Sequence, residues 1–365
     1  MIIVDGYARP PFEVVERKGL GHPDSLADGI SESISRHLCR IYREDFGEIV
    51  HHNLDKVLII GGCSAPKFGG GSILKPPAVV VGGRATVPRG QSLEDVIVAA
   101  ASEHIQGTMR YLRDYSIEPR AREGSPELRS LIGKGANDTS IGVGYAPLSP
   151  VEQKVLELEK VVRGVRGAGD DVKIMAVRNQ DHLRIVVACA MVDRFMGSLE
   201  EYQEAKARIK EAVSARADDA QVFVNAADQG NNIFLTVTGS SVEMGDDGAT
   251  GRGNRGNGLI TPMRPMSIEA IAGKNPVSHV GKIYNVMAQG AAYDLSLLEG
   301  VAEAYVTLVS KIGAPLEEPL LKGVRLTGEG LNRSLEPEVN SILEDWLGRT
   351  ERLVDDFVAG RLGVY

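Results

Sequence analysis

Four apolar residues recur at a spacing of four near the start of the chain, namely Leu26, Ile30, Ile34 and Leu38. This spacing places all four side chains on one face of a helix, because a helical turn takes about 3.6 residues. Pro23 stands just before the pattern, and Asp24 or Ser25 could cap the helix. The pattern therefore predicts an amphipathic helix that opens directly after a histidine.

Apolar runs and periodic stretches alternate along the rest of the chain. Runs rich in Val and Ile that end in turn residues predict strands, whereas spacings of three and four predict helices. The polar "RNQD" between two apolar runs predicts a hairpin over 171–192. Strands are predicted at 56–62, 78–83, 221–226, 232–239 and 302–310, and helices at 92–115, 149–165, 198–216 and 341–358.

These elements interleave without a regular strand–helix–strand rhythm. The order predicts an α/β fold with mixed sheets that helices cover on one side. The length of 365 residues predicts two or three domains. Turn-forming residues fill 116–140, which we expect to be a mobile loop.

Charge and composition narrow the classes of function. The formal net charge of -8 argues against nucleic acid as the main partner. Cys39, Cys63 and Cys189 have no paired spacing, which predicts free thiols in a reducing compartment. The N-terminus lacks a signal-peptide pattern, and the longest apolar run, 185–192, is too short to span a bilayer. We therefore expect a soluble cytoplasmic protein without a membrane partner.

The glycine-rich stretch "GRGNRG" at 251–256 has the spacing of a dinucleotide-binding fingerprint. That fingerprint binds pyrophosphate only where it joins a strand to a helix N-terminus. Here the polar "EMGDDGAT" precedes the glycines and "NGLITPMRPM" follows them, so the context is wrong. The stretch argues for a loop rather than a dinucleotide site.

Acidic and basic residues gather at the predicted element boundaries. Carboxylates bind Mg2+, while lysine, arginine and helix N-termini bind the phosphates that such cations bridge. The carboxylates are Asp24, Asp138, Asp171, Asp246 and Asp247, and the basic candidates are Lys173, Arg252, Lys274, His279 and Lys282. Ordinary turns and solvated charges explain the same residues about equally well, so residue types alone leave a Mg-polyphosphate site open.

The amino-acid sequences of these motifs closely resemble those of one enzyme family. The chain is similar to the archaeal type of S-adenosylmethionine synthetase, or methionine adenosyltransferase, with the family's motifs in order between about residues 13 and 287. The matching stretches are "ERKGLGHPDSLADGI", "HHNLDKVLIIGG", "FGGG", "VGGRAT", "GANDTSIGVGYAPLS", "DVKIMAVR", "LTVTG", "EMGDDGATGRGNRGNGLITPMRPMS" and "AGKNPVSHVGKIYNV".

The resemblance implies that ATP, methionine and water become S-adenosylmethionine, phosphate and pyrophosphate. Sulfur attacks C5′ of ATP and expels triphosphate, which is then hydrolysed. A thioether is already a nucleophile, so the first step needs no general base. The leaving group carries about four negative charges, and catalysis must come from positioning and charge neutralisation.

At the reaction centre, the resemblance assigns hydrogen bonds around the breaking C5′–triphosphate bond to His22. It assigns Mg2+ to Asp24 and triphosphate to Lys274. His279 and Lys282 fall where the family has further phosphate and metal contacts.

At the substrates, the resemblance places Asp171 and Lys173 on the nucleotide and its phosphates. It places Asp246 and Arg252 at methionine or adenosine and the triphosphate, and Asp138 at methionine. His22, Lys173, Arg252 and Lys274 are therefore the expected catalytic residues.

Cys63 in "GGCS" stands where we expect Gln or Glu near the methionine ammonium group. A thiol is a poor partner for an ammonium ion. Either Cys63 is a tolerated small residue, or the enzyme takes another sulfur amino acid or nucleotide. A non-catalytic regulatory subunit is a further alternative, which the intact charged motifs argue against.

The family's fold has three similar α/β domains around a pseudo-threefold axis, interleaved in sequence, which we place approximately at 1–140, 141–240 and 241–365. The resemblance implies a homodimer that pairs through flat sheet faces, with active sites between the subunits and a tetramer left open. It implies two Mg2+ ions per site and leaves a K+ ion open. We expect 116–134 to form a gate over the site.

Overall fold

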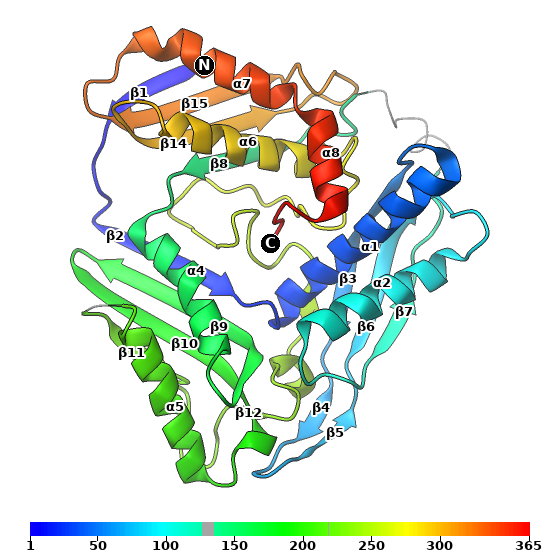
Figure 1. Ribbon diagram of the computed structural model, residues 1–365, viewed down its shortest axis with the longest axis vertical. Helices are drawn as coiled ribbons and strands as arrows, with labels where there is room; N and C mark the ends of the chain where they lie inside the picture. The colour runs from blue at the N-terminus through cyan, green and yellow to red at the C-terminus, as the bar shows by residue number, and fades with distance from the viewer. Residues whose placement is uncertain (126–134, 218) are drawn as a thin grey trace.

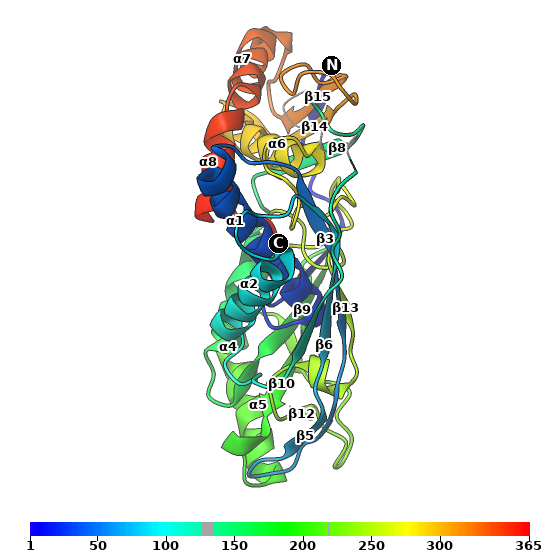
Figure 2. The ribbon, with the colours of Figure 1, turned by 90° about the vertical axis from the view of Figure 1, so that its right-hand side faces the viewer.

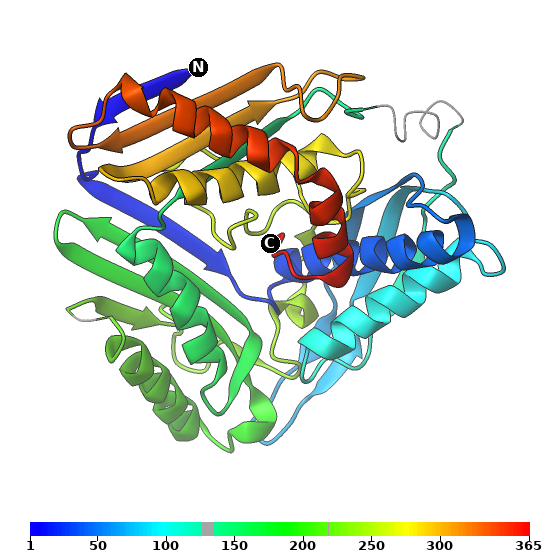
Figure 3. The same cartoon turned by 45° about the horizontal axis from the view of Figure 1, so that its top comes forward.

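The computed structural model describes residues 1–125, 135–217 and 219–365. Three sheets, each covered by helices, surround a common centre near which the C-terminus lies (Figure 1, Figure 3). Each sheet packs its own hydrophobic cluster against its helices. This confirms the mixed α/β architecture that the residue pattern predicted and the three similar units that the resemblance implied.

The order helix–strand–strand–helix–strand occurs three times. In each unit the two long strands pair antiparallel, and the final strand joins the second in parallel. The first unit consists of α1 (Pro23–Phe46), β3 (His52–Ile60), β6 (Ala78–Ala85), α2 (Leu93–Thr108) and β7 (Ser116–Pro119). The second consists of α4 (Pro150–Arg163), β9 (Ala168–Asn179), β10 (His182–Val192), α5 (Leu199–Ser214) and β11 (Gln221–Val224). The third consists of α6 (Val280–Ser296), β14 (Val301–Val309), β15 (Leu321–Gly328) and α7 (Glu336–Leu347), with β1 (Ile2–Gly6) as its final strand. Short additional elements are β4 (Cys63–Ala65), β5 (Ser72–Lys75), β12 (Leu235–Thr236) and α8 (Thr350–Ala359).

A leading strand before each unit joins the sheet of the next unit. Thus β2 (Phe12–Lys18) pairs with β9, β8 (Ile141–Ala146) pairs with β14, and β13 (Gly248–Ala249) pairs with β3, all antiparallel. The units are therefore interleaved around the pseudo-threefold axis. The sequential ranges 1–140, 141–240 and 241–365 stay an approximate prediction, because every sheet borrows a strand from another range.

The first helix forms as its pattern predicts. The four apolar residues at its spacing of four are at most 1% exposed and pack in the cluster of the first unit. The N-cap is His22, rather than Asp24 or Ser25, because its ring accepts a hydrogen bond from the backbone of the second residue beyond it. Gly47 ends the helix in a left-handed conformation.

Helices cover one side of the three sheets and leave the other side free, so that the molecule is a slab in profile (Figure 2). Strand residues alternate between the two sides, and those next to buried core residues point to the free side. Large apolar side chains there remain 37–44% exposed: Leu58, Ile60, Val186 and Phe223. We call this side the helix-free face.

Several predicted boundaries differ from the structure. Residues 116–119 form β7 rather than a loop, because they pair with β6, and the rest of the predicted gate up to 134 includes 126–134, outside the described residues. The predicted helix 341–358 divides at Gly348, which caps α7. Within 232–239 only two residues pair as a strand. Across the described ranges, no helix combines the length and apolarity that crossing a membrane requires.

Candidate active site

The N-terminus of α1 holds a histidine in a defined tautomer. Nδ1 of His22 accepts a hydrogen bond from the backbone N–H of Asp24 at 3.2 Å. Since a backbone N–H can only donate, Nδ1 carries no proton and the neutral ring carries its hydrogen on Nε2. Burial lowers the pKa of His22 to about 4, so the ring is neutral at pH 7 and can donate from Nε2.

Asp24 lies beside this ring as an ionised carboxylate. Its Oδ2 accepts from Nζ of Lys18 at 2.8 Å, and its Oδ1 accepts from the backbone N–H of Ala249 at 3.0 Å. Burial alone would raise the pKa of Asp24, but these hydrogen bonds lower it below its ordinary value. The carboxylate is therefore charged at neutral pH.

Strand pairing gathers positive charge next to His22. Lys18 of β2 lies directly opposite Lys173 of β9, and both point to the helix-free face. Nζ of Lys173 is 3.5 Å from Oε1 of Glu16, while Lys18 also donates to the backbone oxygen of Arg252 at 2.9 Å. After burial, the pKa of His22 is lowered further by Lys18, Lys173 and Arg252, against the opposing effect of Asp24. We call the following residues the α1 cluster: His22, Asp24, Glu16, Lys18, Lys173 and Arg252. Its cations outnumber its carboxylates, and this excess of cations favours an anionic ligand.

A pair of carboxylates adjoins this group. Oδ2 of Asp171 accepts from the backbone N–H and the hydroxyl of Ser241 at 2.9 and 2.6 Å, and the same hydroxyl lies 3.1 Å from Oδ2 of Asp246. Burial raises the pKa of Asp171 to about 6, and Asp246 adds to this rise. The structure thus brings Asp171 and Asp246 together, as the resemblance implies for residues of one substrate site.

A second group surrounds the N-terminus of α6. Nδ1 of His279 accepts from the backbone N–H of Gly281 at 3.2 Å, so its ring repeats the tautomer of His22 at an equivalent helix start. Burial, followed by Lys274, lowers the pKa of His279 to about 3. The ammonium of Lys274 contacts Glu269 and lies 3.9 Å from Asp55. We call His279, Lys274, Glu269 and Asp55 the α6 cluster.

A cavity of about 310 Å3 opens beside His279, with Lys56 and Arg84 in its wall. Asn137 also lines it and accepts from the backbone N–H of Val280 at 3.2 Å. The neighbouring Asp138 is exposed. Asp138 therefore lies with the α6 cluster rather than with the α1 cluster.

Lys282 has a different setting from the other predicted phosphate contacts. Its ammonium is fully buried and donates to both oxygens of Glu32 at 2.6 and 2.8 Å and to the backbone oxygen of Lys274 at 3.1 Å. With three donor hydrogens and these three acceptors, it has none left for a phosphate. This geometry favours a role in holding Lys274.

The two clusters occupy separate stretches of α1. The α1 cluster contacts its start, at Asp24, whereas the α6 cluster is held at Glu32 and at Ser35, whose hydroxyl donates to the backbone oxygen of Lys274. Eight to eleven helical residues correspond to roughly 12–17 Å along the axis. The two clusters therefore lie apart in one chain, and Lys173 and Lys56 both lie on strands that border the helix-free face.

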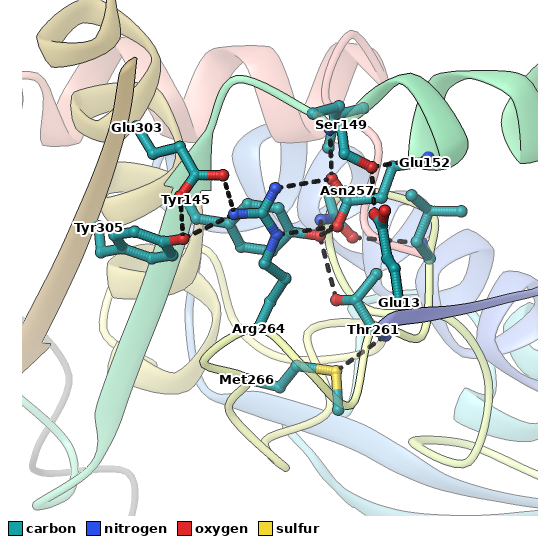
Figure 4. Close-up of polar contacts among 12 residues, drawn as sticks. Glu13, Tyr145, Ser149, Glu152, Asn257, Thr261, Arg264, Met266, Glu303 and Tyr305 are labelled. Atoms are coloured by element: carbon teal, nitrogen blue, oxygen red, sulfur yellow. Dashed lines mark hydrogen bonds and ion pairs between the residues drawn. The ribbon is translucent and has the colours of Figure 1, made fainter. Parts of the chain in front are cut away.

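The third equivalent helix start, at α4, is blocked by a polar network (Figure 4). Ser149 and Glu152 form a capping box, and Glu13 accepts from the Ser149 hydroxyl. Nη1 of Arg264 donates to Glu303 at 2.7 Å, and its Nε donates to Glu152 at 3.2 Å. Carboxylates thus occupy this helix N-terminus, so it is unsuited to an anionic ligand.

The carboxylate oxygens of Asp24 suit a metal ion that is bound to the phosphates of a substrate. Within the described ranges, no group of three or more His, Cys, Asp or Glu side chains could hold a metal by itself. Mg2+ commonly uses one or two carboxylates together with substrate phosphates and water. An ionised Asp24 next to clustered lysines fits that pattern.

Sequence reasoning missed several members of these clusters. Lys18 stands inside the quoted "ERKGLGHPD", but its role becomes visible only once β2 pairs with β9. Ser241, at the start of a short 3-10 helix, and Glu269, in a loop, contact predicted residues from segments that no periodicity marks. The distance along the sequence, more than 200 residues from Lys18 to Arg252, hides the first of these contacts.

The fold and the two clusters define a pseudo-threefold α/β protein in which a neutral histidine beside lysines caps two of the three equivalent helix N-termini. The chain matches the model of the S-adenosylmethionine synthetase (AdoMet synthetase) family over residues 5–361. It is 42% identical over 390 residues to the S-adenosylmethionine synthase of Methanococcus aeolicus, covering 97% of this chain and 96% of that one. It is 40% identical over 398 residues to that of Pyrococcus furiosus, covering 100% and 99%. The chain belongs to the S-adenosylmethionine synthetase family.

Proposed function

We propose that this chain joins ATP and methionine to give S-adenosylmethionine, phosphate and pyrophosphate. Family membership over nearly the full length supports the reaction, and its relatives bear the name S-adenosylmethionine synthase. The structural observation that carries the proposal is the α1 cluster, in which a neutral histidine faces three cations. That composition suits a polyphosphate leaving group.

In the first step the side chains neutralise developing charge and transfer no proton. His22 donates from Nε2 to an oxygen at the breaking C5′–triphosphate bond. Lys173 and Arg252 neutralise the triphosphate as its charge develops, which lowers the barrier where the site is already organised. Mg2+ at Asp24 would add positive charge to the same phosphates.

Lys274 and His279 complete the site from a second copy of the chain. Within one chain the α1 and α6 clusters contact α1 at points roughly 12–17 Å apart, and Lys173 and Lys56 lie on strands that border the helix-free face. That face also carries the exposed apolar residues that a second copy would cover. A homodimer through the helix-free face would place the α6 cluster of one subunit on the α1 cluster of the other.

Asp171 and Asp246 are assigned to the nucleotide and the amino acid, and Asp138 to methionine. Cys63 is exposed in β4, paired with Lys75, and its effect on amino-acid choice stays a prediction. The preference for Mg2+, a K+ ion, a tetramer and a cytoplasmic location also stay predictions.

Product analysis tests the reaction. Purified chain, ATP, methionine and Mg2+ should give S-adenosylmethionine with equal amounts of phosphate and pyrophosphate. Parallel reactions with S-alkyl homocysteines and other nucleoside triphosphates test the choice of substrate. Absence of an adenosylated sulfur product with every amino acid would refute the proposal, and a strong preference for another amino acid would revise its substrate.

A further inference from the structure

Asp28 is a buried carboxylate that none of the roles above uses. It lies one turn after Asp24 on the same side of α1 and is 3% exposed. Its Oδ1 accepts from the backbone N–H of Gly251 at 2.8 Å, while its Oδ2 has no hydrogen-bond partner among the described residues. A buried carboxylate oxygen without a partner is costly, so its retention calls for a reason.

The segment that Asp28 holds carries a cation of the α1 cluster. Arg252 follows Gly251 directly, and its side chain is exposed. Gly251 has a φ of +86°, a conformation that glycine adopts without strain, so the chain turns immediately before the arginine. The hydrogen bond from Gly251 to Asp28 therefore fixes the point from which the Arg252 side chain leaves the backbone.

The two residues before this point also contact the same helix. Asp24 accepts from Ala249, and the hydroxyls of Thr250 and Ser31 are 2.6 Å apart. The fit is close, since a Cβ atom at position 253 would lie 2.4 Å from Oδ2 of Asp28. Three consecutive residues, 249–251, are thus each hydrogen-bonded to side chains on successive turns of α1.

We propose that Asp28 is a positioning residue for the transfer reaction, which holds the loop at Gly251 so that the Arg252 guanidinium meets the expelled triphosphate. The kinetic part of this inference rests on the proposed function, whereas the structural part does not. Asp28 does not touch the substrate in this account and acts only through Arg252.

Kinetics of Asp28→Ala should separate positioning from general damage. We expect kcat to fall about 10-fold to 100-fold with a nearly unchanged KM for methionine, since a displaced donor loses transition-state stabilisation. In an Arg252→Ala background the same substitution should cost almost nothing more, because no guanidinium remains to be positioned. Gly253→Ala, which pushes the loop from the other side, should behave in the same way.

Conservative and matched variants sharpen the test. Burial raises the pKa of Asp28 to about 7, so the neutral amide in Asp28→Asn is a close substitute that still accepts from Gly251, and it should restore most of kcat. Asp193 is the matched control: it is buried, accepts from Gly71 at 2.6 Å and also has one oxygen without a partner within the described residues. If Asp193→Ala lowers kcat, the double variant with Arg252→Ala should lose kcat by the product of the two single fold-losses.

Hydrogen exchange tests the structural part without substrates. Backbone amides over 248–256 should exchange faster in Asp28→Ala than in the wild type or in Asp193→Ala, whether or not the enzyme makes S-adenosylmethionine. Unchanged exchange over 248–256 in a folded Asp28→Ala or Gly253→Ala chain would support only a packing role and overturn the inference. Multiplicative kinetic losses of Asp28→Ala or Gly253→Ala with Arg252→Ala would also overturn it.

Discussion

Two histidines perform the same local task at two helix starts. His22 and His279 each accept a backbone N–H two residues further along, and each keeps a neutral ring with its hydrogen on Nε2. The sequence allowed us to select both residues, because "GHPD" and "SHVG" precede helical patterns and resemble family motifs. The tautomer could not be predicted, since it depends on the position of one backbone hydrogen.

His22→Ala should lower the rate of adenosyl transfer about 100-fold or more while changing ATP affinity only slightly, because the lost hydrogen bond acts mainly in the transition state. Single-turnover rates and ATP titration check this prediction. His104→Ala is the control, since His104 is likewise partly buried with a pKa lowered to about 4 but lies outside both clusters. Equal losses of transfer rate in the two variants would refute the specific role of His22.

Acid should inactivate the enzyme through Asp171. Burial holds its pKa near 6, above the ordinary 3.8, so the carboxylate gains a proton as the pH falls through about 6. The proton disturbs the bonds from Ser241, and kcat/KM for ATP should decline on the acid side with a midpoint near this value. If Asp171→Asn keeps the same acid limb, a different group titrates.

Among the elements, α1 connects the α1 cluster and the α6 cluster. Its first turns hold Asp24 and the 248–256 loop, and its middle holds Lys274 through Glu32 and Ser35. The amphipathic pattern predicted the apolar face of this helix correctly. It gave no information on the polar face, because the partners there come from loops far along the chain whose approach depends on the packing of all three units.

The buried pair of Glu32 and Lys282 should be structural. Glu32→Ala leaves the Lys282 ammonium buried without its partner and should cost about 3–5 kcal/mol of unfolding free energy. Replacing both residues by methionine should recover much of that stability and keep the transfer rate within an order of magnitude. Chemical denaturation and steady-state kinetics measure the two effects. A stable but inactive double variant would instead show that the pair acts in the reaction, by holding Lys274 or by contacting phosphate.

At the scale of the whole molecule, the threefold arrangement is absent from the residue pattern. The sequence shows no repeat of residue identities, and the shared helix–strand–strand–helix–strand order is obscured because each leading strand joins another unit. The resemblance supplied the pseudo-threefold axis, and periodicity alone gave only mixed sheets under helices. Two of the three equivalent helix starts have a histidine N-cap and the third has a capping box, a comparison that is possible only in the folded chain.

We infer that one active site combines the α1 cluster of one chain with the α6 cluster of another. Mixing an inactive His22→Ala chain with an inactive Lys274→Ala chain, under conditions that exchange subunits, tests it directly. Half of a random mixture would be mixed dimers with one intact site each, so activity should recover to about a quarter of the wild-type value. No recovery, in a mixture shown by mass to contain mixed dimers, would contradict the account.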